Sequence, residues 1–101
     1  MYVRTLDGLL ADSEQQLAID YIRQSIGPAL RRQAGFVSAC FWHNPASGQS
    51  QLVLIWDSEA DRQRAEADGF LRTLLAHLAQ YYAAPPRYQH YEIHVQINSL
   101  R

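Results

Sequence analysis

The sequence of 101 residues is 48% hydrophobic and 19% charged, a composition typical of one ordered globular domain over residues 1–101 and not of a disordered chain. The formal net charge is -1 and no basic cluster exceeds the pair Arg31–Arg32, so we expect no binding to nucleic acid. No apolar run approaches the roughly 20 residues of a membrane span, and the first ten residues lack a signal-peptide pattern, so we expect a cytoplasmic protein that does not bind membranes.

The first third of the chain predicts a strand followed by a helix. Tyr2–Leu6 has the composition of a short strand. After a turn, Ser13 and Gln16 form a capping-box pattern that marks a helix start, and an apolar stripe with helical spacing follows. Pro28 falls inside this pattern and is expected to kink or interrupt the helix. Gly35 is expected to end it.

The most informative stretch is a predicted hairpin. Two apolar runs, Phe36–Trp42 and Leu52–Trp56, are separated by the turn Asn44–Gly48. A hairpin with one wet face should alternate apolar and polar residues, and neither run does so cleanly. We therefore expect both faces of the sheet to be covered.

The second half of the chain predicts two helices and a last strand. Ser58 starts a short helix, and the charged residues over 57–66 are predicted to form its solvated face. A second main helix, Phe70–Tyr82, carries an apolar stripe on one side. An extended loop over 83–88 leads to Tyr91–Ile97, which alternates as a strand should.

The order of these elements predicts the fold class. Strand, helix, strand, strand, helix, strand is the order of the ferredoxin-like βαββαβ fold, an α+β fold with a four-stranded antiparallel sheet and two helices on one face. The predicted helices can cover only one face of the sheet. The other face would then meet a second subunit, and two sheets packed face to face would form a homodimeric α+β barrel.

Four segments carry a resemblance to a known family. They are Ile26–Ala29 late in the first helix, Gly35–Phe36 at the start of the second strand, the turn Asn44–Gly48, and Leu54–Glu59 crossing from strand into helix. With these segments the chain resembles the antibiotic-biosynthesis-monooxygenase-like family of dimeric α+β barrels over nearly its whole length. The resemblance implies the barrel fold and a homodimer.

The resemblance also bears on chemistry. Relatives include cofactor-free oxygenases of polyketide quinols, quinol monooxygenases, haem-degrading enzymes and proteins without known activity. The haem-degrading members have an Asn in the first strand and a His that ligates iron in the second main helix. Here Tyr2–Leu6 contains no Asn, Leu74 stands where the ligand is expected, and His77 comes one turn later. Haem degradation is therefore not expected, and no metal or cofactor is expected.

Five residues are candidates for a site that binds a small aromatic molecule. His77, at the edge of the apolar face of the second helix, is a candidate base because its pKa lies near working pH. Tyr81 would orient a substrate hydroxyl. Trp42 and Trp56 end the two hairpin strands and would wall a flat pocket by stacking, and Tyr21 would also contact substrate. The alternative for each residue is a packing role, or for His77 a half-exposed surface position.

Two absences narrow the chemistry further. All nine basic residues are Arg, so Schiff-base chemistry on a lysine, including that of pyridoxal phosphate, is excluded. The one cysteine permits no intrachain disulfide and no Cys-rich zinc site. Cys40 lies in an apolar strand and is expected to be a small buried hydrophobic residue.

A few polar residues remain as weaker candidates. His90, Glu92 and His94 are spaced by two and share one face of a strand. Their side chains suit zinc or ferrous iron, but neighbours on one strand do not readily converge on one ion, so a solvent or intersubunit position is the alternative. Arg4 and Arg72 are candidates for holding an anionic substrate, with a plain surface position as the alternative.

Three functions are consistent with these observations. The first is a cofactor-independent monooxygenase that uses molecular oxygen and a small hydroxylated aromatic or quinol, with His77 as the base. The second is a non-catalytic homodimer that binds a small hydrophobic ligand or acts in a stress response. The third is a lyase or isomerase on the same barrel, which would consume no oxygen.

Overall fold

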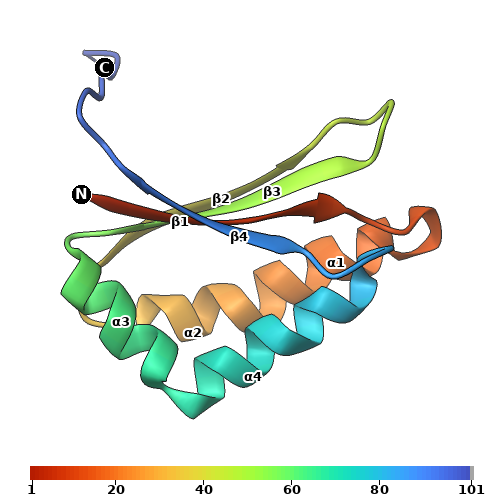
Figure 1. The fold of residues 1–101 in the computed structure, drawn as a ribbon, viewed down its shortest axis with the longest axis horizontal. Helices are drawn as coiled ribbons and strands as arrows, with labels where there is room; N and C mark the ends of the chain where they lie inside the picture. The colour runs from red at the N-terminus through yellow and green to blue at the C-terminus, as the bar shows by residue number, and fades with distance from the viewer. Residues whose placement is uncertain (101) are drawn as a thin grey trace.

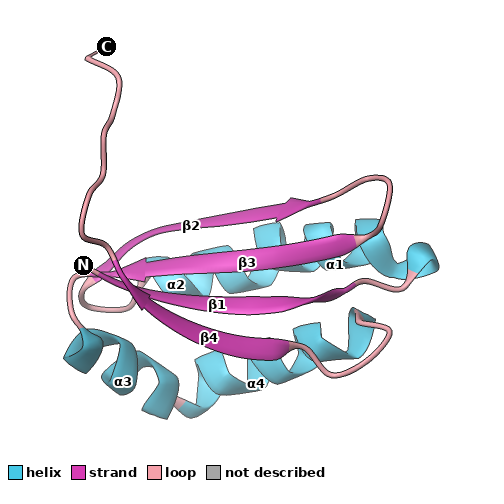
Figure 2. Cartoon of the chain, turned by 45° about the horizontal axis from the view of Figure 1, so that its top comes forward, coloured by secondary structure: helices cyan, strands magenta, loops and turns pink. Residues whose placement is uncertain are grey.

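The protein forms one antiparallel sheet with helices on a single face (Figures 1 and 2), as described for residues 1–100 by a computed structural model. The strands are β1 (Tyr2–Leu9), β2 (Phe36–His43), β3 (Gln49–Trp56) and β4 (Arg87–Glu92). The helices are α1 (Gln15–Tyr21), α2 (Gly27–Arg31), α3 (Glu59–Ala67) and α4 (Gly69–Leu78). Shorter segments are the 3-10 turns η1 (Asp12–Glu14) and η3 (Ala79–Tyr81) and the π-helical segment η2 (Ile22–Ile26).

The sheet has the strand order β2-β3-β1-β4, and each neighbouring pair is antiparallel. This is the ferredoxin-like arrangement, so the predicted fold class is confirmed. The helices cover one face, which we call the helix face, and leave the opposite face, the open face, without cover from residues 1–100 (Figure 1). No helix in this part of the chain is long and apolar enough to cross a membrane.

The first helical region is more continuous than predicted. Pro28 is the second residue of α2, and the chain reaches it through η2, whose wider turns run on from α1 without a break. The predicted capping box at Ser13 is not formed, because α1 begins at Gln15 and no side chain caps it. Gln16 instead donates to Asp20 Oδ1 at 3.0 Å, one turn further on.

The helix starts predicted in the second half are confirmed by their caps. Ser58 Oγ accepts the backbone N–H of Asp61 at 3.2 Å and begins α3. Asp68 Oδ1 accepts the N–H of Phe70 at 2.9 Å and begins α4, directly after α3 has ended. This backbone hydrogen bond, together with one from the Gln33 side chain, lowers the pKa of Asp68.

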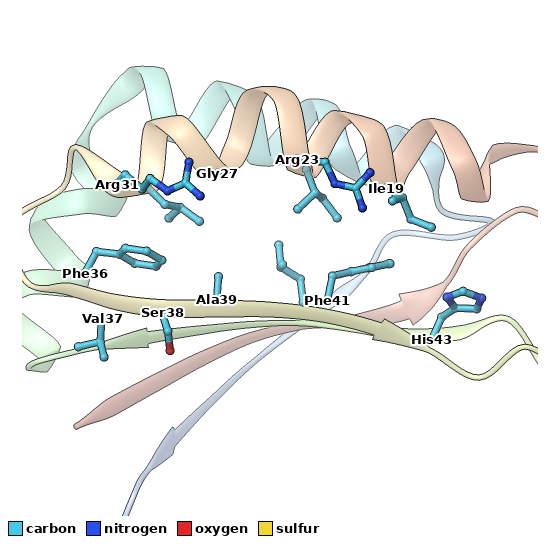
Figure 3. A pocket seen from close by; sticks show the side chains of 13 residues that line it. Ile19, Arg23, Gly27, Arg31, Phe36, Val37, Ser38, Ala39, Phe41 and His43 are labelled. Carbon is cyan, nitrogen blue, oxygen red and sulfur yellow. The ribbon is translucent and has the colours of Figure 1, made fainter. Parts of the chain in front are cut away.

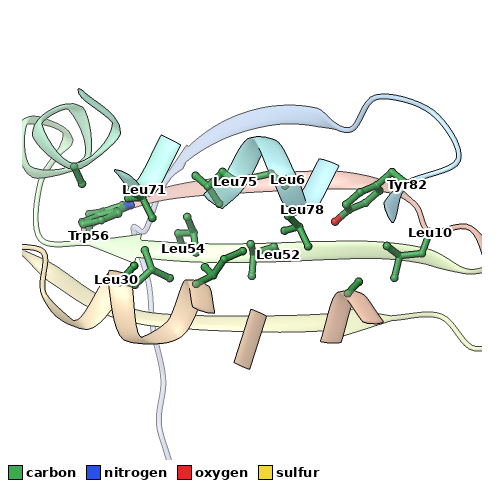
Figure 4. Close-up of a cluster of buried hydrophobic side chains, with 14 residues drawn as sticks. Leu6, Leu10, Leu30, Leu52, Leu54, Trp56, Leu71, Leu75, Leu78 and Tyr82 are labelled. Atoms are coloured by element: carbon green, nitrogen blue, oxygen red, sulfur yellow. The ribbon is translucent and has the colours of Figure 1, made fainter. Parts of the chain in front are cut away.

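The hydrophobic core lies between the helix face and the helices (Figure 4). Alternate residues of β3 point into it, so Leu52, Leu54 and Trp56 are at most 1% exposed. The helices contribute a complementary apolar layer, with Leu30 from α2 and Leu78 from α4 both fully buried. The complete buried cluster is Leu6, Leu10, Ala18, Ile26, Ala29, Leu30, Leu52, Leu54, Trp56, Ala65, Leu71, Leu75, Leu78 and Tyr82.

Three predictions from the sequence are corrected. β1 continues to Leu9, where a turn was expected, because its full length pairs with β3. β4 covers Arg87–Glu92 instead of Tyr91–Ile97, because the strand that it pairs with, β1, begins at Tyr2 and offers no partner beyond Ile93. Cys40 is exposed, because it lies on the open face, where nothing in residues 1–100 covers it.

Candidate functional site

A polar cluster lies where β1 and β4 face α3 and α4. Arg4 pairs with His90 across the two strands, and Tyr2 pairs with Glu92. Residues paired across an antiparallel ladder share a face, and Arg4 reaches Glu66 of α3, so this face is the helix face. The alternation of β1 therefore places a guanidinium group in a row that otherwise faces the core, between Tyr2 and Leu6.

Two arginines share one carboxylate in this cluster. Arg4 Nε lies 2.9 Å from Glu66 Oε1, and Arg62 Nη1 lies 2.5 Å from Glu66 Oε2. The side chains of Arg4 and Arg62 are only 14% and 12% exposed, and that of Glu66 is 22% exposed. A second carboxylate, Glu59, lies 3.6 Å from Arg62 but is 58% exposed. Among the largely buried side chains positive charge therefore exceeds negative charge, and an anionic ligand group would be stabilised there.

His90 is held in one tautomer by its neighbours. Arg4 Nη1 contacts His90 Nε2, and Tyr2 Oη lies 2.7 Å from His90 Nδ1. Because arginine carries only donors, Nε2 is the acceptor, and the ring proton sits on Nδ1 and is donated to Tyr2 Oη. Loss of solvent around the ring, followed by the charges of Arg4 and Arg62, lowers the pKa of His90. This shift favours the neutral imidazole, and the His90 side chain, like that of His77, is exposed.

A small cavity of about 280 Å³ adjoins this cluster. Arg4 and Glu66 form its polar wall, and Leu75 and Tyr88 are among its apolar and aromatic residues. The Arg4 guanidinium lies 4.6 Å from the centre of the Tyr88 ring, a cation–π distance. The complete lining is Arg4, Glu66, Arg72, Leu75, Ala76 and Tyr88, so the two arginines singled out in the sequence meet at one cavity.

The structure brings together three of the residues predicted from the sequence to bind or convert substrate. His77 Nε2 lies 3.1 Å from Tyr81 Oη, and the His77 and Tyr21 rings are 4.5 Å apart. The three side chains come from α4, η3 and α1. They form a cluster at the surface with His77 exposed, and none of them lines the cavity beside Arg4.

The two tryptophans lie on opposite faces of the sheet. Trp56 is fully buried in the core, packs edge-on against Phe36, and its Nε1 has no hydrogen-bond partner (Figure 4). Trp42 is 53% exposed and donates to Gln51 Oε1 at 3.1 Å on the open face. The structure therefore does not bring them together as two walls of one pocket.

A second, larger cavity of about 890 Å³ lies between the first helical region and β2 (Figure 3). Its floor includes Phe36, Ala39 and Phe41, whose side chains point toward the helices, while Arg23 and Arg31 lie on the helical side. The full lining is Ile19, Ile22, Arg23, Gly27, Leu30, Arg31, Phe36, Val37, Ser38, Ala39, Phe41, His43 and Leu52. We call this cavity the β2 groove.

The three possible metal ligands of the last predicted strand, His90, Glu92 and His94, do not converge, because His90 has other contacts than Glu92 and His94. His90 is bonded to Tyr2 and Arg4, while His94 Nε2 lies 3.6 Å from Glu92 Oε2 beyond the end of β4. Among residues 1–100, no group of three or more His, Cys, Asp or Glu side chains is placed to hold a metal ion.

The sequence did not lead us to predict that Arg4 contacts Glu66 and that Tyr2 contacts His90. Glu66 was assigned to a solvated helix face, and Tyr2 was treated only as part of a strand. One signal was available: in β1 the positions that alternate with Tyr2 and Leu6 include Arg4, a charged residue in a row that should face the core. A charge at such a position needs a partner, and α3 supplies it through Glu66.

Comparison with solved structures identifies known proteins that share this fold. A monooxygenase from the gene ActVA-Orf6 of Streptomyces coelicolor, solved with the ligand nanaomycin D, superposes with a TM-score of 0.83 at 17% identity, covering 97% of this chain and 91% of that one. A structure described as an antibiotic biosynthesis monooxygenase gives a TM-score of 0.75 at 8% identity, with 92% and 98% covered. The chain has the fold of the antibiotic biosynthesis monooxygenases.

The same fold also occurs in a protein of unknown function from Nitrosomonas europaea, which gives a TM-score of 0.75 at 15% identity, with 99% of this chain and 95% of that one covered. No protein-family model and no curated protein matches the sequence. At such identities the likeness establishes the fold and leaves the function to be argued from the site.

Proposed function

We propose that the protein is a cofactor-independent monooxygenase acting on a small hydroxylated aromatic or quinol, with its site at Arg4 and His90. The observation that carries the proposal is the contact between His90 and Arg4, an arginine that also lines the cavity of about 280 Å³. A neutral imidazole accepts a proton from a phenol, and a guanidinium group stabilises the phenolate that results.

The first step is proton transfer. The substrate hydroxyl enters between Arg4 and His90, gives its proton to Nε2, and leaves its oxygen anion against the Arg4 guanidinium. The electron-rich ring then reduces molecular oxygen, so the substrate itself is the reductant. For an anthrone-type ring, the carbon opposite the phenolate changes from CH₂ to C=O. One oxygen atom of O₂ enters there, and the other leaves as water with the two hydrogens.

The volume and the lining residues of the cavity limit which substrates can bind. A volume of about 280 Å³ lies at the lower end of the range for small-molecule pockets, which favours a compact ring system. Leu75 and Ala76 offer apolar contacts to the ring faces, and Tyr88 offers an aromatic edge. Arg72 lies at the same cavity and supplies a second positive charge for an anionic substituent.

We further propose that the protein is a homodimer through its open face. Large apolar side chains on this face are exposed, with Trp42 at 53%, Tyr91 at 50% and Leu9 at 40%. Near one end of the face the apolar residues Val3 and Ile55 are paired. Exposed apolar side chains grouped in this way are typical of an interface between proteins. A second copy would cover it and close a barrel from two sheets.

Oxygen consumption by the purified protein tests the activity. We expect uptake with quinols and anthrone-like phenols when neither flavin nor metal is added, and a loss of at least tenfold in His90→Gln, which keeps a polar side chain but lacks the base. His77→Ala is the matched control and tests the role predicted for His77 and Tyr81 from the sequence. Full activity in His90→Gln and loss in His77→Ala would move the site to the surface cluster.

A second candidate function is binding of a small hydrophobic ligand without catalysis. Two observations favour it: the exposed position of His77 and the volume of the β2 groove, about 890 Å³. Binding of an aromatic ligand by calorimetry, with no oxygen uptake and no chemical change in the ligand, would support this function over the first.

A further inference from the structure

The floor of the β2 groove is a part of the helix face that the helices leave uncovered. Ala39 pairs with Leu54 of β3, so its side chain lies on the helix face. Phe41, two residues further along β2, lies on the same face. Leu54 is buried in the core, whereas Ala39 is exposed and Phe41 is only partly buried. An apolar floor along β2 is therefore open to solvent beside the first helical region (Figure 3).

The helical side of the groove has a gap at Gly27. Outside its own helical turn, an added Cβ at this position would meet only the Ile22 carbonyl oxygen, at 3.4 Å, which is ordinary contact. The φ angle of Gly27 is -54°, a helical value that any residue adopts. Glycine disfavours a helix relative to alanine, and neither packing nor backbone conformation requires it here. Its effect is to leave the groove unfilled.

The wide helical turns of η2 end at this gap. The N–H of Gly27 donates to Ile22 O, five residues earlier, and Pro28 follows without an N–H of its own. Turns of this π-helical kind occur frequently at functional sites. Ile22 and Gly27 both line the groove, so the irregular part of the helix forms its wall.

The two side chains of permanent charge that line the groove are both positive. Arg23 and Arg31 lie four residues before and four residues after Gly27, on the helical side (Figure 3). Neither makes an ion pair with any of residues 1–100, and no Asp or Glu is among the lining residues. Eight residues of helix span about 12 Å, so the two guanidinium groups flank the gap. The groove therefore combines an apolar floor with a cationic rim.

We propose that the β2 groove binds a free carboxylic acid with a linear apolar chain. The carboxylate lies at the gap, between Arg23 and Arg31, where guanidinium groups donate charge-assisted hydrogen bonds. The chain lies along the floor and removes Phe36 and Phe41 from water. A linear ligand fits the shape of the groove, because one strand and one helical region bound it, and Ile19 to Arg31 span about 18 Å along the helices.

This site is separate from the one proposed for catalysis. The β2 groove and the cavity beside Arg4 share no lining residue. The groove also lies on the helix face, opposite to the face proposed for the dimer. Binding of the acid therefore does not depend on oxygenase activity, and a binding assay tests it independently of oxygen uptake.

Calorimetry with decanoate tests the role of charge. We expect one decanoate to bind per chain, and decyltrimethylammonium, a cation with the same chain length, to bind at least tenfold more weakly. Replacing both Arg23→Gln and Arg31→Gln should weaken decanoate binding at least tenfold. The matched control is Arg32→Gln, an exposed neighbour that does not line the groove, and its affinity should stay within threefold of wild type.

A second pair of variants tests the gap. Gly27→Leu places a side chain in the groove and should weaken decanoate binding at least tenfold. Gly69→Leu is the control, because Gly69 begins α4 away from the groove and an added Cβ there meets nothing within 4 Å. Leucine favours a helix over glycine, so the Tm of Gly27→Leu should not fall below that of wild type. A loss of binding then cannot be ascribed to unfolding.

The imidazole signals of His43 and His90 show which cavity is occupied. His43 lines the groove, whereas His90 contacts Arg4. We expect decanoate to shift the His43 signals in nuclear magnetic resonance spectra and to leave those of His90 in place. Four results would overturn the proposal: no binding of decanoate, equal affinity for the two amphiphiles, wild-type affinity in Gly27→Leu, or shifts of His90 with His43 unmoved. None of them bears on oxygen uptake with quinols.

Discussion

The charge cluster around Glu66 offers a test of the site through stability. Glu66 makes charge-assisted contacts with Arg4 and Arg62 at 2.9 and 2.5 Å, and Glu66→Gln keeps the shape but removes the charge. The contact with Arg62 is a hydrogen bond to a charged group, worth about 1.5–3 kcal/mol, and the contact with Arg4 is an ion pair. Removing one partner of a buried pair leaves the other charge uncompensated. Because the Glu66 side chain is 22% exposed, solvent screening reduces the expected total, and we predict a loss of about 2–3 kcal/mol.

Urea denaturation at one fixed protein concentration measures this loss, and in thermal melts it corresponds to roughly 10 to 20 °C in Tm. The control is Glu59→Gln, whose side chain is 58% exposed and lies 3.6 Å from Arg62, and whose loss should stay below about 1 kcal/mol. Since the charge of Glu66 raises the pKa of His90, Glu66→Gln should also lower that pKa. Equal losses for the two variants, with the His90 pKa unmoved, would refute the cluster.

Three further predictions concern the fold. Leu78→Ala removes a fully buried side chain and should cost about 2–5 kcal/mol, against less than about 1 kcal/mol for Leu17→Ala, whose side chain is 53% exposed; urea denaturation compares them. The pKa of Asp68 is lowered in the fold by the Phe70 N–H, so its cap stabilises above the unfolded-state pKa of 3.8 and is lost as pH falls through the folded value. In Asp68→Asn, stability measured below pH 4 should fall less steeply than in wild type. Gly35→Ala should be destabilising in thermal melts, because φ is +80° and an added Cβ would collide with the Asp61 side chain.

Local signals in the sequence were sufficient to predict the fold. The unbroken apolar runs of β2 and β3 indicated a sheet that is covered on both sides. The helix start at Ser58 was visible because a cap acts within three residues. The same kind of signal failed at Ser13. There a 3-10 turn precedes the helix, so Ser13, which matches the capping pattern, lies one position before the actual N-cap residue, Glu14.

The last strand was misplaced because β1, the strand with which it pairs, does not extend far enough. The alternation from Tyr91 to Ile97 is the cleanest in the sequence, yet β4 stops at Glu92 where β1 runs out. The alternation of apolar and polar residues indicates which side chains are suited to burial. It does not indicate whether the residues that would cover them are present in the same chain.

The site was only partly predictable. Arg4 and Arg72 were considered as binders of an anionic substrate, and His90 was considered only as a metal ligand. Their proximity was not predicted, because it depends on the packing of α3 and α4 against β1 and β4. His77 and Tyr81 are four residues apart on a helical segment, so their contact followed from spacing alone. Trp42 and Trp56 end neighbouring strands, but they belong to opposite faces, which the bulge in β2 obscures in the sequence.

The most direct test of the proposed site is nuclear magnetic resonance of the imidazole groups during titration with a hydroxylated aromatic ligand. The four histidines report on different places: His90 on the Arg4 cluster, His77 on the surface cluster, His43 on the β2 groove, and His94 on the segment beyond the end of β4. The account predicts that the His90 signals shift first and that Arg4→Gln weakens this response at least tenfold. Shifts confined to His77 or His43, with His90 unmoved at saturation, would contradict it.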